Sequence, residues 1–181
     1  MRQFEVEFKF KADNIDFKVF DSWALSLEPK MILYTSSEDE YYAVPYADFV
    51  RLRYDRHTYE LTIKKKTAEK NNIIRFEGNI DVTNNTREDI DIFLEGIEAK
   101  KLFSIIKKCS IFYFPDAILA LYDVYDESFN HKGRFLEVEA EREIVTSQEH
   151  ALEIIQKYEK LFKEKFNIDY HNRIKKSLFD L

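Results

Sequence analysis

Two carboxylates and an ammonium group share one face of the first predicted strand. Side chains alternate along an extended chain, so Glu5, Glu7 and Lys9 lie on one side, and Val6 and Phe8 lie on the other. Paired carboxylates can ligate hard cations, and a nearby ammonium can bind phosphate. A solvated edge strand would show the same alternation. The chemistry therefore depends on whether other strands repeat the pattern.

A second acidic strand repeats it near the far end of the chain. In the segment 137–141, Glu137, Glu139 and Glu141 share one face. The strands between the two acidic ones instead carry basic residues on one face, at Arg51, Arg53, Lys64, Lys66 and Arg75. Solubility alone does not require carboxylates at both ends and basic residues between them.

We interpret the sorted charges as the interior of a closed antiparallel barrel whose apolar outer faces are covered by helices. Carboxylate pairs suit Mg²⁺ or Mn²⁺, and an array of Arg and Lys suits the polyanion that such cations accompany. The predicted ligand is a metal-bound phosphate chain. If the charged faces are solvated instead, the same strands describe a generic interaction domain.

Hydrophobic periodicity predicts the elements of this barrel. Alternation predicts strands over 4–11, 31–44, 49–54, 59–66, 74–82, 118–125 and 135–141, with a polar hairpin loop at 67–72. Residues 102–114 fit a helix or a strand, but their β-branched and aromatic content favours a strand. Helices are predicted over 14–28, 86–95 and 146–162, with Thr86 as a cap, Thr146 and Glu149 as a capping box, and Trp23 in the core.

Composition describes a globular chain. With 181 residues and 45% hydrophobic residues, the simplest organisation is one domain over 1–181. The net charge of −6 argues against a general nucleic-acid surface. The apolar runs are too short to span a bilayer, so no membrane partner is expected.

Counts of three residue types narrow the function further. The chain has only 3 glycines, and no glycine-rich phosphate loop is present. Its 4 histidines lack metal-ligand spacing, so a zinc site is not expected. Cys109 is the single cysteine and cannot form an internal disulfide, and no basic leader precedes the first strand. We therefore expect a cytoplasmic protein.

The chain resembles the CYTH family, also called the triphosphate tunnel metalloenzymes, through ordered motifs that cover most of the sequence. The segment 5–9 is similar to the family's Glu-x-Glu-x-Lys signature, and 39–45 resembles its second-strand pattern. The basic strands follow in family order at 51–53, 61–64 and 75–77, and 133–139 resembles the closing acidic strand.

The resemblance implies an α+β fold, a closed antiparallel eight-stranded β-tunnel with a charged interior and helices packed outside. Family members hydrolyse or cyclise triphosphates, so the implied catalytic residues are Glu7, Glu139 and Lys9. Glu7 or Glu139 would assist deprotonation of water, and Lys9 would contact phosphate rather than act as a base. The implied metal ligands are Glu5, Glu7, Glu77, Asp123, Glu137 and Glu139. The implied phosphate ligands are Lys9, Arg51, Arg53, Lys64, Lys66, Arg75 and Lys108.

Two positions depart from the family pattern. Cys109 stands where the family's Lys-x-Arg motif has arginine, and Ser37 stands where its second strand usually has glutamine. Lys108 would substitute for the missing arginine from a shifted register, but a lysine does not reproduce bidentate guanidinium contacts. We expect Cys109 to be inert because no histidine partner is indicated.

The leading expectation is a triphosphatase that depends on Mg²⁺ or Mn²⁺ and takes a triphosphate-containing small molecule as its partner. A class IV type adenylyl cyclase, making cyclic AMP and pyrophosphate from ATP, is the first alternative. A nonhydrolytic nucleotide or polyphosphate binding module is the second. The sequence leaves open which triphosphate is bound, and a homodimer is compatible with it.

Overall fold

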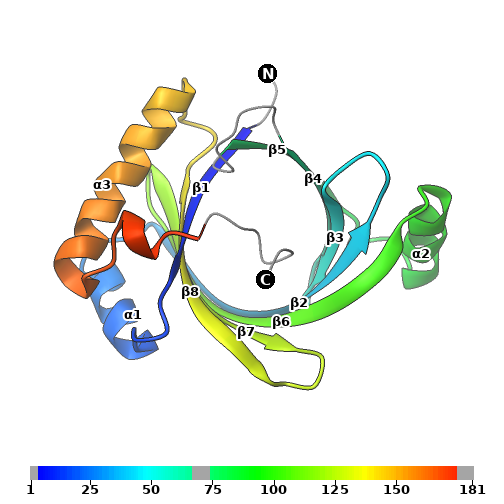
Figure 1. Cartoon of the computed structure of the whole chain (residues 1–181), viewed down its shortest axis with the longest axis horizontal. Coiled ribbons are helices and arrows are strands. Elements are labelled where there is room, and N and C mark those ends of the chain that lie inside the picture. Colours follow the sequence, from blue (N-terminus) through cyan, green and yellow to red (C-terminus); the bar gives the residue numbers. More distant parts are fainter. Residues whose placement is uncertain (1–3, 67–73, 175–181) are drawn as a thin grey trace.

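Eight antiparallel strands wrap around a central opening in the computed structural model, which describes residues 4–66 and 74–174 (Figure 1). The strand order is β1-β5-β4-β3-β2-β6-β7-β8, and β8 pairs with β1 to close the barrel. The expected α+β tunnel is confirmed. The strands are β1 (Phe4–Lys11), β2 (Met31–Ala43), β3 (Phe49–Tyr54), β4 (Tyr59–Lys66), β5 (Ile74–Asp81), β6 (Lys100–Tyr113), β7 (Ala117–Asp126) and β8 (His131–Ala140).

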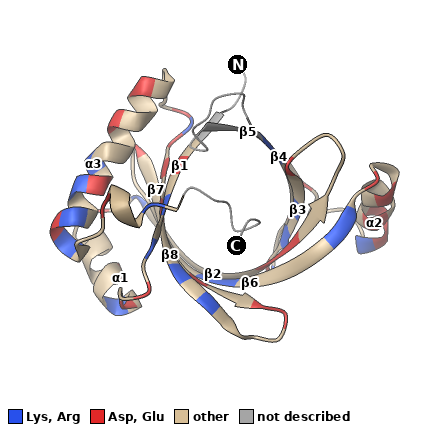
Figure 2. Ribbon diagram, viewed as in Figure 1, with Lys and Arg blue, Asp and Glu red and all other residues tan. Residues whose placement is uncertain are grey.

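Alternation along the strands separates charged side chains from the apolar core. On β1, Glu7 and Lys9 line the interior cavity, whereas Val6, Phe8 and Phe10 are buried on the other face. The main core therefore lies between the barrel wall and the helices outside it. Figure 2 shows charged residues distributed along the strands that enclose the opening.

Helices α1 (Phe17–Leu25) and α3 (Gln148–Phe166) cover the same side of the barrel, next to β1 (Figure 1). Phe162 of α3 is fully buried and meets Phe10 of β1 edge to face, with ring centroids 5.8 Å apart. Trp23 of α1 packs against Phe166 of α3 at 5.0 Å, which confirms its expected place in the core. Helix α3 contacts β1 directly, whereas α1 packs against β6 and α3.

Helix α2 (Arg87–Gly96) covers the opposite side of the barrel, beside β3 (Figure 1). Its buried Ile90 and Leu94 pack with Leu52 and Leu61 of the β3–β4 pair. The predicted cap is confirmed, because the Thr86 hydroxyl accepts a hydrogen bond from the Asp89 backbone N–H at 3.1 Å. Within the two described segments, no helix is long and apolar enough to cross a membrane.

Several element boundaries differ from the predictions. The N-cap of α3 is Ser147 rather than Thr146, since the Ser147 hydroxyl accepts from the His150 N–H at 3.1 Å. Helix α1 starts at Phe17, after Asp16, whose carboxylate accepts from the Lys18 N–H at 2.9 Å. The segment predicted over 102–114 is a strand, as expected. The hairpin loop predicted at 67–72 lies outside the described residues.

Candidate functional site

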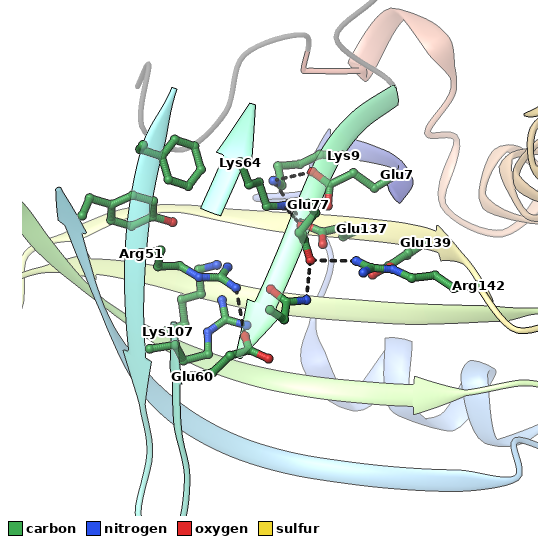
Figure 3. Close-up of a pocket in the computed structure, with 14 residues that line it drawn as sticks. Glu7, Lys9, Arg51, Glu60, Lys64, Glu77, Lys107, Glu137, Glu139 and Arg142 are labelled. Atoms are coloured by element: carbon green, nitrogen blue, oxygen red, sulfur yellow. Dashed lines mark hydrogen bonds and ion pairs between the residues drawn. The ribbon is translucent and has the colours of Figure 1, made fainter. Parts of the chain in front are cut away.

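A cavity of about 210 Å³ lies inside the barrel, and charged side chains from most of its strands line it (Figure 3). Glu7, Glu77, Glu137 and Glu139 lie toward one end, and Arg51, Lys107 and Glu60 lie toward the other. The lining residues are Glu7, Lys9, Tyr41, Phe49, Arg51, Arg53, Glu60, Lys64, Glu77, Asn79, Lys107, Glu137, Glu139 and Arg142.

The pairing of β1 with β8 builds the acidic end. Glu7 lies opposite Glu139 and Lys9 lies opposite Glu137, so the two sequence motifs face each other. Lys9 Nζ is 3.2 Å from Glu137 Oε2 and 3.6 Å from Glu7 Oε1. Burial acts to lower the pKa of Lys9, but the two glutamates outweigh it and raise that pKa above its ordinary value. Lys9 therefore remains an ammonium between two carboxylates.

Glu139 lies close to three other carboxylates of the cavity. Its burial raises the pKa of its carboxyl group, the Arg142 guanidinium opposes this, and the carboxylates of Glu7, Glu77 and Glu137 add to the rise. The resulting pKa is about 7. Glu139 thus has the acidity of a group that exchanges a proton near neutral pH.

The β4–β5 pair contributes a further carboxylate to the same end. Glu77 lies opposite Lys64 in the register, and Lys64 Nζ approaches Glu77 Oε2 to 2.6 Å. Asn79 donates to Glu77 Oε1 at 2.7 Å. Both members of the ion pair are buried, so Glu77 is fixed in the cavity wall.

The basic end is organised by Asp39, which is fully buried on β2. Arg53 donates to both carboxylate oxygens, at 2.6 and 2.7 Å, and Lys107 Nζ lies 3.2 Å from Oδ2. Burial would raise the pKa of Asp39, but these cations hold it well below its usual range. Arg51 Nη1 lies 4.0 Å from Asp39 Oδ2, and its Nη2 donates to the Thr62 hydroxyl at 2.8 Å and to Glu60 at 3.2 Å. The guanidiniums are therefore oriented before any ligand binds.

The structure gathers most of the predicted site residues into one cavity. These are Glu7, Lys9, Arg51, Arg53, Lys64, Glu77, Glu137 and Glu139. The side chains of Glu5, Lys66 and Arg75 are outside the described part of the structure, although the backbone register places Arg75 opposite both Glu5 and Lys66. Their roles stay predictions.

Two predicted residues lie away from the cavity. Lys108 is exposed, and its Nζ lies 5.1 Å from the centre of the Tyr125 ring. Asp123 is bound by Arg134, at 2.8 and 2.9 Å, and lies 3.1 Å from His131. Both residues alternate with inward-facing neighbours, and strand geometry therefore turns them to the outer face. Lys108 therefore does not lie with the predicted phosphate ligands, and Asp123 does not lie with the predicted metal ligands.

Sequence reasoning missed four charged residues of the cavity and its surroundings. Lys107 and Lys108 are adjacent on β6 and point to opposite faces, and the inward-facing one is Lys107 rather than the predicted Lys108. Asp39 and Glu60 were visible as acidic residues on predicted strands. Asp39 stands between Glu38 and Glu40, and Glu60 shares its strand with lysines, and neither context indicates an ion pair. Arg142 lies in a turn after β8, where no strand periodicity points to it.

Cys109 occupies the inner face of β6, two residues after Lys107. Burial raises the pKa of its thiol to about 11, although Lys107 and Arg53 act in the opposite direction. The thiol is therefore protonated at neutral pH, as an inert residue would be.

The donor set fits a hard divalent cation. Glu7, Glu77, Glu137 and Glu139 supply only carboxylate oxygens, which Mg²⁺ and Mn²⁺ prefer. Among the described residues no three acidic, histidine or cysteine side chains already form a metal-binding group. Basic side chains lie between the glutamates instead, so a cation would have to replace some of these ion pairs.

Comparisons with known proteins agree with this geometry. The family model for the CYTH domain matches residues 3–170. The PH1012 protein of Pyrococcus horikoshii OT3 has 20% identity and a TM-score of 0.77, with 98% of each chain covered. An adenylate-cyclase candidate from Vibrio parahaemolyticus has 16% identity and a TM-score of 0.71, covering 99% of this chain and 98% of its own.

The Mimivirus capping enzyme triphosphatase is similar at 14% identity and a TM-score of 0.55, covering 91% of this chain and 89% of its own. At such identities these structures show the shared fold. No match was found among the curated proteins.

Proposed function

Because the chain belongs to the CYTH domain family, we propose that its tunnel binds a triphosphate together with a divalent cation and hydrolyses it. One observation carries the proposal: a single cavity combines four glutamates at one end with Arg51 and Lys107 at the other, where Arg53 shares Asp39 with Lys107. Carboxylates suit the cation, and guanidinium and ammonium groups suit the phosphate chain. The triphosphatase and adenylate-cyclase names among its structural neighbours are consistent with chemistry on triphosphates.

The chain's own residues supply binding and charge stabilisation. Arg51, Arg53 and Lys107 contact oxygens of the phosphate chain at the basic end. Lys9 and Lys64 lie beside the glutamates and stabilise negative charge on the phosphoryl group that reacts. Positioned donors of this kind make up most of the catalysis in phosphoryl transfer.

The glutamates supply the acidic part of the mechanism. Glu7, Glu77, Glu137 and Glu139 would hold Mg²⁺ or Mn²⁺, which supplies neutralisation of phosphate charge and a more acidic water. Of these four residues, Glu139 would accept the proton of the attacking water, and its burial beside other carboxylates supports this role because both raise the pKa of its carboxyl group in the absence of metal. Its removal should therefore affect the rate more strongly than it affects folding.

The test is product analysis after incubation with inorganic triphosphate or ATP, each with Mg²⁺ or Mn²⁺. We expect orthophosphate release, and a loss of about 10²-fold or more in Glu139→Gln. The matched control is Glu153→Gln, which changes an exposed glutamate on α3 and should keep the wild-type rate. Formation of cyclic AMP and pyrophosphate from ATP would show that the protein is a cyclase and not a triphosphatase. Binding of triphosphate without any product would show that the protein is not a catalyst.

A further inference from the structure

Arg142 reaches into the acidic end of the cavity from outside the strands. It lies in the turn at residues 142–144, between β8 and α3, and its side chain is 24% exposed. Its Nη2 is 2.7 Å from Glu77 Oε1, and its Nε is 3.1 Å from Glu139 Oε1 (Figure 3). The guanidinium therefore joins β5 to β8 across the intervening strand β1.

The Arg142 guanidinium lies where a divalent cation bound by Glu77 and Glu139 would also lie. Glu77 and Glu139 belong to the carboxylate set that suits Mg²⁺ or Mn²⁺, and one guanidinium already contacts an oxygen of each. Charge-assisted hydrogen bonds of this length are among the stronger polar contacts in proteins. A cation that binds both carboxylates must displace these two hydrogen bonds of Arg142.

Arg142 lies in a turn, whereas the other basic residues at this end of the cavity lie on strands. Lys9 and Lys64 are on strands whose register fixes them opposite Glu137 and Glu77. Arg142 has no strand register to hold it, because it follows the end of β8. Its long side chain can leave the carboxylates by rotation about its own bonds without a change in the barrel.

We propose that Arg142 is a positioning residue that occupies the cation site of the metal-free protein and gives way when a divalent cation binds. This inference rests on the proposed metal-dependent function. In the metal-free protein Arg142 neutralises Glu77 and Glu139, which otherwise repel each other and Glu7. In the metal-bound protein the cation takes over this neutralisation, so Arg142 competes with metal and sets the concentration at which the site fills.

Removal of the guanidinium has two opposite consequences. Without metal, the glutamates lose a neutralising partner, so the melting temperature should fall. With metal, one competitor fewer remains, so the affinity for the cation should rise. A residue that only supported the fold would lower stability in both forms and leave metal affinity unchanged.

The experiment is calorimetric titration of Mn²⁺ into wild-type protein and into Arg142→Gln and Arg142→Lys variants, at one ionic strength and without substrate. We expect about tenfold tighter binding in Arg142→Gln, the scale of one charged hydrogen-bonded pair. Arg142→Lys keeps the charge and should lie between the other two. The control is Arg87→Gln, which removes a guanidinium 2.8 Å from Glu40 on the outside of the barrel and should leave Mn²⁺ affinity unchanged.

The outcomes separate this inference from the proposed function. Equal or weaker Mn²⁺ binding in Arg142→Gln, with triphosphatase activity present in the wild type, would overturn the role of Arg142 and leave the function standing. Absence of Mn²⁺ binding in every variant would overturn both. If Arg142→Gln does not fold, unchanged affinity in Arg142→Lys overturns the inference, and tighter binding supports it.

Discussion

Lys107 and Lys108 are adjacent residues of β6 whose side chains lie on opposite sides of the barrel wall. Lys107 is 7% exposed, with its Nζ 3.2 Å from the buried Asp39, whereas Lys108 lies over the outer ring of Tyr125. We predict that Lys107→Ala weakens the binding of inorganic triphosphate about tenfold or more, because a charged hydrogen-bond donor is lost. Lys108→Ala should stay within about twofold of the wild type.

Calorimetric titration of the two variants side by side measures this difference, and each serves as the control for the other. The two substitutions remove the same charge from neighbouring positions, so a net-charge effect would appear equally in both. Equal weakening in Lys107→Ala and Lys108→Ala would therefore contradict the placement of the phosphate ligands on the inner face of β6.

Residue alternation predicted the cavity well where one face of a strand is clearly apolar. On β1, Val6 and Phe8 mark the core face, and this orients Glu7 and Lys9 correctly. On β6, lysines occupy both faces, so the pattern does not say which one points inward. The prediction that Asp123 ligates metal was wrong for a related reason: β7 is largely buried on both faces, so burial does not tell which face points inward. Arg142 lies in a turn, where alternation has no meaning.

The strand β1 and the helix α3 form the element pair that supports the acidic end of the cavity. Phe162 of α3 is fully buried, with its ring 5.8 Å from Phe10 and 5.8 Å from Trp23. We predict that Phe162→Ala lowers the free energy of unfolding by about 3–5 kcal/mol, through lost burial and the cavity that remains. Urea denaturation monitored by circular dichroism measures the change.

The matched substitution is Phe93→Ala on α2, where the side chain is 50% exposed. It removes the same atoms from a surface position, so a change within about 0.5 kcal/mol is expected. A similar loss in both variants would show that α3 does not hold β1 through this aromatic contact.

Element boundaries were less predictable than element types. The sequence of α3 offers both Thr146 and Ser147 as caps, and the choice depends on which hydroxyl meets a free backbone N–H at the first turn. That geometry is set by how the turn after β8 enters the helix. The strand at 100–113 was predictable because β-branched and aromatic residues suit a barrel wall that is packed on its outer face.

At the scale of the whole molecule, the interior is nearly balanced in charge although the chain carries −6 overall. The basic lining residues are Lys9, Arg51, Arg53, Lys64, Lys107 and Arg142, and the acidic ones are Glu7, Glu60, Glu77, Glu137 and Glu139. These groups pair with one another and with the buried Asp39, which holds Arg53 and Lys107. A triphosphate alone would separate basic residues from their carboxylates and leave those carboxylates buried without partners, which is costly.

A triphosphate and a divalent cation together avoid this cost, because the cation takes the carboxylates while the phosphates take the basic residues. We therefore predict that triphosphate with Mg²⁺, near 100 times its dissociation constant, adds about 2.7 kcal/mol of stability, which is roughly 5–10 °C in melting temperature. Triphosphate with a chelator in place of Mg²⁺ should give less than half of that shift. Differential scanning calorimetry of the wild-type protein with a non-hydrolysable triphosphate analogue measures both conditions on intact ligand. Sulfate at the same ionic strength is the control. Equal shifts with Mg²⁺ and with chelator would mean that the carboxylates and the basic residues of the tunnel do not act as coupled sites.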